Sequence, residues 1–127
     1  MEGYKVEIVH STKELTVREK IRIKDLSNAI QLDDATQQEG NIVIDFDYYV
    51  ILKVHNEFSK DDKDYNKYVI VDKSGNKFVT GSESFMTSLE GIVDEMADAG
   101  ETDFEIEVYR KDSKNYTGKQ FLTCTIV

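Results

Sequence analysis

The feature that most constrains the fold is the run from residue 42 to residue 54, IVIDFDYYVILKV. Its first eight residues place an apolar side chain at every second position, the period of a β-strand with one buried face. Every residue from Tyr48 to Leu52 is apolar, which indicates a strand that curves or becomes covered on both faces. A chain of 127 residues is large enough for one such folding unit, and two separate cores are not expected.

Upstream of this strand the pattern predicts one strand and one helix. Tyr4, Val6 and Ile8 alternate with Lys5, Glu7 and Val9, which is a short strand-like run. Thr16 and Glu19 have the spacing of a capping box, and apolar residues then recur at helical intervals, so a helix is expected from about 17 to 31. Residues 33–40, DDATQQEG, are expected to be a polar break. Residues 1–40 therefore look like an N-terminal strand–helix extension packed on the domain that follows.

Downstream, alternation and turn residues predict four more strands, at residues 68–71, 77–80, 104–109 and 121–127. Asp72–Asn76 has the composition of a hairpin turn. Ser82 is placed to cap a helix with an apolar face, and Gly100 is placed to end it.

From residue 42 the expected order is three strands, a helix and two strands, which is the layout of a five-stranded OB barrel with its helix between strands 3 and 4. The fold prediction is therefore α+β, with an OB-like β-barrel domain over residues 41–127 preceded by the strand and helix of residues 1–40. A generic α+β roll has the same order of elements and stays open.

The charged residues are unevenly distributed along the chain. The net charge is −9, and residues 78–109 contain nine acidic and no basic side chains. Residues 110–127 contain four basic side chains and one acidic side chain. Such asymmetry concerns partners and electrostatic steering rather than fold. The acidic groups also serve solubility, and this explanation stays open.

Enzymatic and metal-binding patterns are poorly supported. His10 and His55 are the only histidines, and neither has metal-ligand spacing to a second histidine or a cysteine. Cys124 lies within an expected strand, where a buried, inert thiol is the ordinary interpretation. Residues 61–64 resemble half of a calcium loop but lack its glycine and terminal glutamate. We therefore expect no enzymatic activity, cofactor or metal.

The same composition bears on the compartment. The longest uninterrupted apolar run, Tyr48–Leu52, is far shorter than the roughly 20 residues that a membrane-spanning helix requires. A single cysteine excludes an intramolecular disulfide, as is usual in a reducing environment. The sequence therefore predicts a cytoplasmic protein without a membrane partner.

The best functional candidate is the segment 109–121, which interleaves four cations with three aromatic side chains. Single-stranded nucleic acid is bound by this mixture, because cations contact phosphates and aromatic faces stack on bases. In an OB barrel this segment would be the loop between strands 4 and 5, and residues 57–67 would be the loop between strands 1 and 2. The same composition is also ordinary hairpin chemistry. The predicted contacts are Lys60, Lys63, Tyr65, Lys67, Arg110, Lys111, Lys114, Tyr116 and Lys119.

Three short stretches carry a family resemblance: Tyr68–Val71, Thr80–Phe85 (TGSESF), and Ser113–Lys119 (SKNYTGK) with the Thr123-Cys124 pair that follows. They resemble small proteins encoded by phages and prophages of Gram-positive bacteria, some of which are taken to be single-stranded DNA-binding proteins. The resemblance implies a DNA-binding role in replication or recombination, in the cytoplasm of a bacterial host cell.

Two functions from different classes therefore stay open. The first is a single-stranded DNA-binding protein, with a host or phage protein partner and homo-oligomer formation as further expectations. The second is an acidic protein-binding inhibitor, a phage anti-defence factor whose acids on residues 78–109 imitate the phosphates of DNA. The net charge of −9 favours the second function, and the two basic-aromatic segments favour the first.

Overall fold

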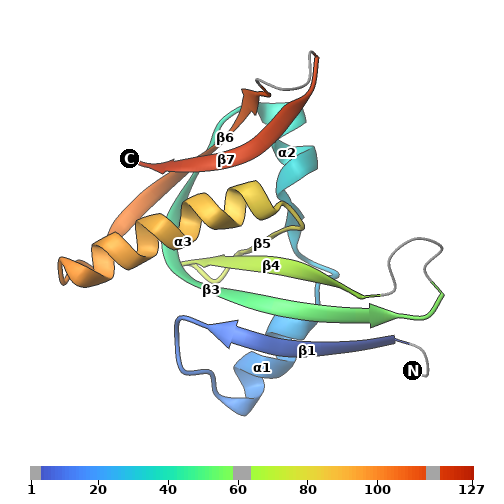
Figure 1. The fold of residues 1–127 in the computed structure, drawn as a ribbon. Coiled ribbons are helices and arrows are strands. Elements are labelled where there is room, and N and C mark those ends of the chain that lie inside the picture. The colour runs from blue at the N-terminus through green and yellow to red at the C-terminus, as the bar shows by residue number, and fades with distance from the viewer. Residues whose placement is uncertain (1–3, 59–63, 114–117) are drawn as a thin grey trace. The chain divides into compact units, whose positions relative to one another are not determined.

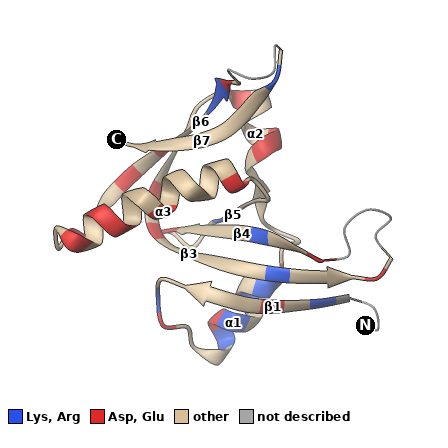
Figure 2. Ribbon diagram, viewed as in Figure 1, with Lys and Arg blue, Asp and Glu red and all other residues tan. Residues whose placement is uncertain are grey.

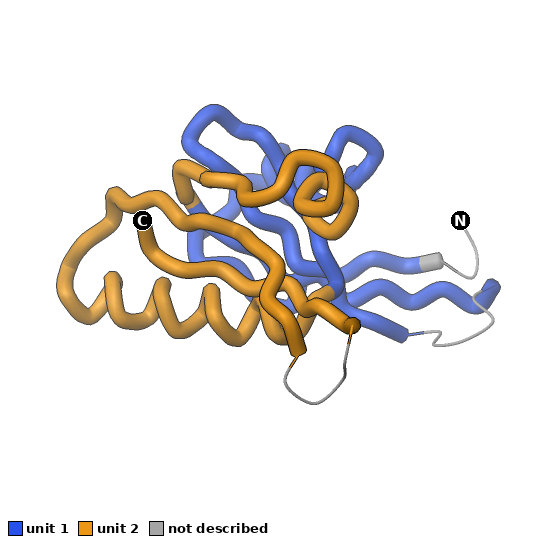
Figure 3. The backbone as a smooth tube through the Cα atoms, turned by 90° about the horizontal axis from the view of Figure 1, so that it is seen from above, with its two compact units in different colours: residues 1–30, 48–81 blue, residues 31–47, 82–127 orange. Residues whose placement is uncertain are grey.

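The computed structural model describes residues 4–58, 64–113 and 118–127, which form a mixed α+β fold (Figure 1). In chain order the described elements are β1, α1, β2, α2, β3, β4, β5, α3, β6 and β7. The chain divides into two compact units, residues 1–30 with 48–81 and residues 31–47 with 82–127 (Figure 3). Strand β3 (Ile42–Asn56) contributes its first part to the second unit and the remainder to the first.

The first unit contains an antiparallel sheet. Strand β1 (Tyr4–Ser11) pairs with β3, and β4 (Asp64–Asp72) pairs with β5 (Lys77–Thr80). Strand β3 lies between β1 and β4 in this sheet. The core of this unit is built from one helix residue and alternate strand residues, namely Ile23, Tyr48, Val50, Leu52, Val69, Val71 and Val79.

The first helix is shorter than predicted. Helix α1 (Val17–Lys24) begins with the expected capping box, because Thr16 accepts from the Glu19 amide and the Glu19 side chain accepts from the Thr16 amide. The helix ends at Lys24, because the next residue, Asp25, has an extended backbone conformation. The Asp25 carboxylate accepts hydrogen bonds from the amide and the hydroxyl of Ser27. The ammonium group of Lys77 donates to the carbonyls of Arg22 and Asp25, which satisfies backbone acceptors at the helix end. The prediction of a helix to residue 31 is wrong, since Ile30–Gln31 form strand β2.

The predicted hairpin turn between β4 and β5 is confirmed. The Asp72 carboxylate accepts from the amides of Ser74 at 3.0 Å and Asn76 at 2.8 Å. Gly75 has φ of 88°, a backbone conformation that side-chain-bearing residues rarely adopt. The register runs from Tyr68 opposite Thr80 to Val71 opposite Lys77.

The second unit contains three antiparallel strands of the same sheet and two helices. Strand β3 pairs with β6 (Phe104–Asp112), which pairs with β7 (Gln120–Ile126). Helix α3 (Glu83–Asp98) begins after Ser82, whose hydroxyl accepts from the Phe85 amide. It packs along β7, where Ser84 donates to the Leu122 carbonyl at 2.9 Å. The buried side chains of this unit include Ile44, Phe85, Leu89, Ile106, Val108 and Leu122.

A helix also occupies the segment predicted to be a polar break. Helix α2 (Leu32–Glu39) buries Leu32 and Thr36, which lie one turn apart, and apart from Ala35 its other side chains are polar and mostly exposed. The Thr36 hydroxyl donates to the Leu32 carbonyl at 2.8 Å, and Gly40 with φ of 81° follows the helix. The prediction is wrong because two buried residues suffice to dock so short a helix, and two residues leave no periodic signal.

From β3 onward the observed order is strand, strand, strand, helix, strand, strand, as predicted. The mixed α+β class and the preceding N-terminal strand and helix are confirmed. The proposed domain boundary at residues 40 and 41 stays a prediction.

Candidate nucleic-acid interface

The first group of predicted contacts lies on strand β4 rather than in a loop. Lys60 and Lys63 lie outside the described residues. Strand β4 already begins at Asp64, so Tyr65 and Lys67 are strand residues, and the predicted loop over 57–67 is too long. Being two residues apart, they share one face, and the Lys67 ammonium lies 5.9 Å from the centroid of the Tyr65 ring. The structure therefore brings these two predicted contacts together as a cation–aromatic pair.

An ion-pair network joins the ends of β3 and β4 beside this pair. The His55 Nδ1 lies 2.7 Å from the Asp64 carboxylate, and its Nε2 lies 3.5 Å from Glu57. Hydrogen bonds to Asp64 first and Glu57 second raise the pKa of His55 above its ordinary value of 6.5. The sequence pattern gave no signal for this network, because Asp64 lies nine positions from His55.

The second group of predicted contacts is divided between the two faces of a hairpin. Lys114 and Tyr116 lie outside the described residues. Strand β6 extends to Asp112 and β7 begins at Gln120, so the projecting loop predicted over 109–121 is too long. The Ser113 amide donates to the Lys119 carbonyl at 2.9 Å, which extends the hairpin stem to exposed Lys119.

Tyr109, Lys111 and Phe121 lie on one face of this hairpin, and we call these three residues the outer cluster. Tyr109 and Lys111 are two positions apart on β6, and Lys111 pairs directly with Phe121 of β7. Directly opposed residues of an antiparallel pair have side chains in contact range. Lys111 is exposed, Phe121 is 37% exposed, and Tyr109 is half-buried. The sequence analysis counted both aromatic residues in the candidate segment 109–121 but named only Lys111 of this cluster as a contact, although strand alternation was the signal that could have selected all three.

Arg110 lies on the opposite face and contacts helix α2. Its Nη2 donates to the Asp33 carbonyl at 2.7 Å, and its Nε donates to the Thr36 hydroxyl at 3.1 Å. The Arg110 side chain is 18% exposed. Its guanidinium therefore holds α2 against β6, a role that the sequence pattern did not indicate.

Charge is segregated between the two units. Residues 1–30 and 48–81 contain twelve basic and ten acidic side chains, a net charge of +2. Residues 31–47 and 82–127 contain four basic and fifteen acidic side chains, a net charge of −11. Acidic residues of this unit occur along α3 in particular (Figure 2). In the second unit, basic side chains are confined to the β6–β7 hairpin.

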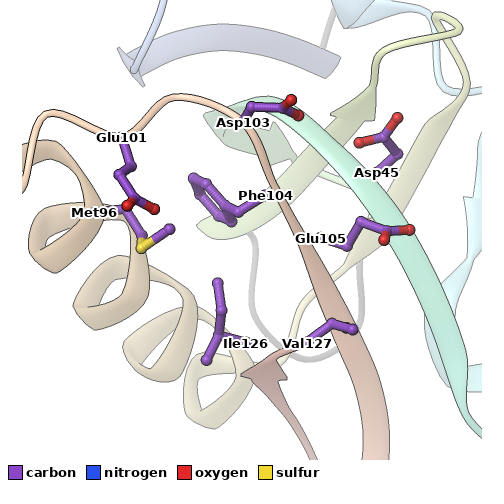
Figure 4. Close-up of a pocket in the computed structure, with 8 residues that line it drawn as sticks. All are labelled: Asp45, Met96, Glu101, Asp103, Phe104, Glu105, Ile126 and Val127. Atoms are coloured by element: carbon purple, nitrogen blue, oxygen red, sulfur yellow. The ribbon is translucent and has the colours of Figure 1, made fainter.

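Two adjoining hollows lie beside α3 in the second unit. An apolar groove of about 540 Å³ runs between α3 and β7, and its lining includes Ile92, Met96 and Ile126. A pocket of about 640 Å³ shares Met96 and Ile126 with this groove (Figure 4). The pocket is lined by four carboxylates, those of Asp45, Glu101, Asp103 and Glu105. In residues 4–58, 64–113 and 118–127, no group of three or more His, Cys, Asp or Glu side chains could hold a metal ion.

Within the part of the chain that the structure describes, no helix combines the length and apolar character needed to cross a membrane. Comparison of the chain with protein-family models, curated proteins and solved structures finds no match.

Proposed function

We propose that the protein binds single-stranded DNA through its two basic-aromatic groups. The observation that carries this proposal is the outer cluster, in which exposed Lys111 lies directly opposite Phe121 and on the same face as Tyr109. Aromatic faces stack on unpaired bases irrespective of sequence, and a neighbouring cation contacts the phosphates between them. The Tyr65–Lys67 pair on β4 presents the same two chemistries.

We also propose that the strands follow OB topology. Three observations support it: β3 is 15 residues long, it pairs with β6 through residues 42–46, and it neighbours β4 in the sheet. A long first strand shared in this way, followed by a hairpin, a helix and a second hairpin, is compatible with an OB barrel. Oligonucleotides bind OB folds at strands 2 and 3 and at the loops after strands 1 and 4. In this correspondence, Tyr65 and Lys67 are on strand 2, and the outer cluster lies at the base of the loop after strand 4.

The proposal is tested by fluorescence polarisation with a labelled thymidine oligonucleotide of about 20 nucleotides and a matched duplex. The wild-type protein should prefer the single strand, and its affinity should fall with salt by a log–log slope of about −0.7 per phosphate neutralised. Phe121→Ala should weaken binding about 5- to 150-fold, the range that corresponds to a stacking free energy of roughly 1–3 kcal/mol.

Lys111→Ala should weaken binding and reduce the salt slope by about 0.7. Lys73→Ala, in the exposed β4–β5 turn, removes the same charge at a residue that belongs to neither basic-aromatic group and serves as the matched control. Equal affinity for duplex and single strand, or equal effects of Lys111→Ala and Lys73→Ala, would contradict the proposal.

A second function, the acidic protein-binding inhibitor, is favoured by the net charge of −11 on the second unit. Two variants distinguish this function from DNA binding. One of them changes Tyr116, which lies outside the described residues. If the protein binds DNA, Tyr116→Ala should weaken oligonucleotide affinity, whereas Asp94→Lys/Glu95→Lys should leave it unchanged or tighten it. If wild type and both variants all fail to bind the oligonucleotide, DNA binding is rejected.

A further inference from the structure

Helix α1 presents an exposed apolar stripe bordered by cations. Val17 and Ile21, one turn apart, are 73% and 66% exposed, whereas Ile23 on another face of the helix is buried in the core of the first unit. Half of the eight residues of α1 are basic and all four of these are exposed, namely Arg18, Lys20, Arg22 and Lys24. At 100° per residue, the two lysines lie on one side of the stripe and the two arginines on the other.

The α3–β7 groove of the second unit has the complementary character. Its apolar lining includes Ile92, Met96 and Ile126, and Ile126 is 42% exposed. Glu95 also lines the groove, and the carboxylate-lined pocket adjoins it at Met96 and Ile126. Figure 4 shows the carboxylates of Glu101, Asp103 and Glu105 around this pocket. The groove thus offers an apolar surface bordered by acids where α1 offers an apolar surface bordered by bases.

We propose that helix α1 of one molecule docks into the α3–β7 groove of a second copy of this chain. An amphipathic helix that lays its apolar face into a hydrophobic groove is a recurring mode of recognition, with anchors at positions i and i+4. Val17 and Ile21 are the anchors, and the cations of α1 face the acids around the groove. The occupant is a second copy because the two complementary surfaces are both exposed on the same chain.

The contact is heterologous, because the two surfaces that meet are different. A docked pair therefore still presents one free helix, on one copy, and one free groove, on the other, and further copies add head to tail. This inference stands without the proposed function. Where the proposed function also holds, neighbouring copies on a single strand contact one another, and coverage of the strand is cooperative.

The test measures the mass of the full chain by sedimentation velocity across a concentration series, at about 50 mM and about 500 mM salt. The mass should rise with concentration at low salt and fall toward the monomer at high salt. Net charge alone predicts the reverse, because copies that each carry −9 repel more strongly at low salt.

Two variants each remove one of the two surfaces. Ile21→Glu alters the exposed α1 stripe and keeps the groove, whereas Met96→Lys alters the groove and keeps α1. Each variant alone should remain monomeric, because every contact needs one surface of each kind. An equimolar mixture should form a 1:1 dimer that does not extend, through the groove of the first variant and the α1 of the second.

Val43→Glu is the matched control, since Val43 is 52% exposed on β3 and the substitution changes the charge as Ile21→Glu does. It should associate like wild type. If Met96→Lys fails to fold, Glu95→Lys at the exposed border of the groove replaces it in the mixture.

A wild-type protein that stays monomeric at low salt would overturn the proposal. So would self-association of either variant alone, or a mixture without the heterodimer. A monomeric wild type together with a mixture without the heterodimer is the result expected if a different protein occupies the groove. Oligonucleotide affinity is measured on the Ile21→Glu monomer, which retains the outer cluster. Loss of DNA binding and loss of self-association are thereby recorded as separate results.

Discussion

Arg110 and Lys111 are adjacent cations with different roles, because neighbouring strand residues face opposite sides of a sheet. Arg110 donates two hydrogen bonds to α2, and its side chain is largely buried. Hydrogen bonds to charged groups contribute about 1.5–3 kcal/mol each, and removing the donor also leaves acceptors of α2 without this partner. Arg110→Ala should therefore lower the free energy of unfolding by about 1–3 kcal/mol.

Lys111→Ala should change the same quantity by less than about 0.5 kcal/mol, because Lys111 is exposed. Urea denaturation of both variants measures the difference. If the two substitutions cost the same stability, the bonds to Asp33 and Thr36 do not hold α2 in place.

His55 confers a pH dependence on the first unit. Its pKa is raised by hydrogen bonds to Asp64 and then to Glu57, so the protonated ring is favoured in the folded state. The stabilisation is fully present below the unfolded-state pKa, about 6.5, and is lost as the pH rises through the higher folded-state pKa. NMR titration of the His55 ring should give a midpoint above that of an unfolded peptide.

Asp64→Asn removes the larger of the two causes, so the midpoint of His55 should move down toward its ordinary value. Glu57→Gln should move it less, because Glu57 is the smaller cause and lies 3.5 Å away. An unchanged midpoint in Asp64→Asn would show that the 2.7 Å contact is not formed in solution.

At the residue scale, the sequence predicted strand faces better than side-chain partners. The buried thiol of Cys124 is confirmed, and burial raises its pKa to about 12. That prediction needed only the alternation of β7. The bonds of Arg110 to α2 join residues 74 and 77 positions apart. No local pattern contains such a partner, so the sequence alone places Arg110 among the predicted nucleic-acid contacts.

At the element scale, prediction succeeded where burial is periodic. Burial alternates along much of β3 and β6, and α3 buries Phe85 and Leu89 one turn apart. Prediction was wrong where a few specific contacts decide the structure. The end of α1 depends on Asp25 and on the distant Lys77, and α2 depends on two buried residues and Arg110.

Gly91 lies inside α3 and offers a direct test of helix stability. It has no positive φ, and a Cβ added there meets no atom within 4 Å. Alanine lowers the conformational entropy of the unfolded chain relative to glycine and favours the helix. Gly91→Ala should therefore raise the free energy of unfolding by about 0.5–1 kcal/mol.

Gly75→Ala is the matched comparison, because Gly75 has equal space around it but φ of 88°. It should lower the free energy of unfolding, and thermal denaturation of the pair measures both changes. A destabilising Gly91→Ala would mean that α3 or its surroundings are more crowded than the structure indicates.

At the scale of the whole molecule, the net charge of −9 conceals a division into units of +2 and −11. The charges counted along continuous segments of the sequence show only part of this division, because each unit is assembled from two separated stretches of chain. A net negative charge does not oppose contact with DNA at a basic site, since charges beyond roughly 8–10 Å are screened at physiological salt. The local groups on the β6–β7 hairpin and on β4 therefore decide binding.

The chain crosses between its compact units three times, after residues 30, 47 and 81. The middle crossing falls inside the continuous strand β3. No single stretch of the gene therefore encodes one unit by itself, and a recombination event with one breakpoint cannot transfer either unit intact to another protein. The basic unit and the acidic unit are therefore exchanged only together by such an event.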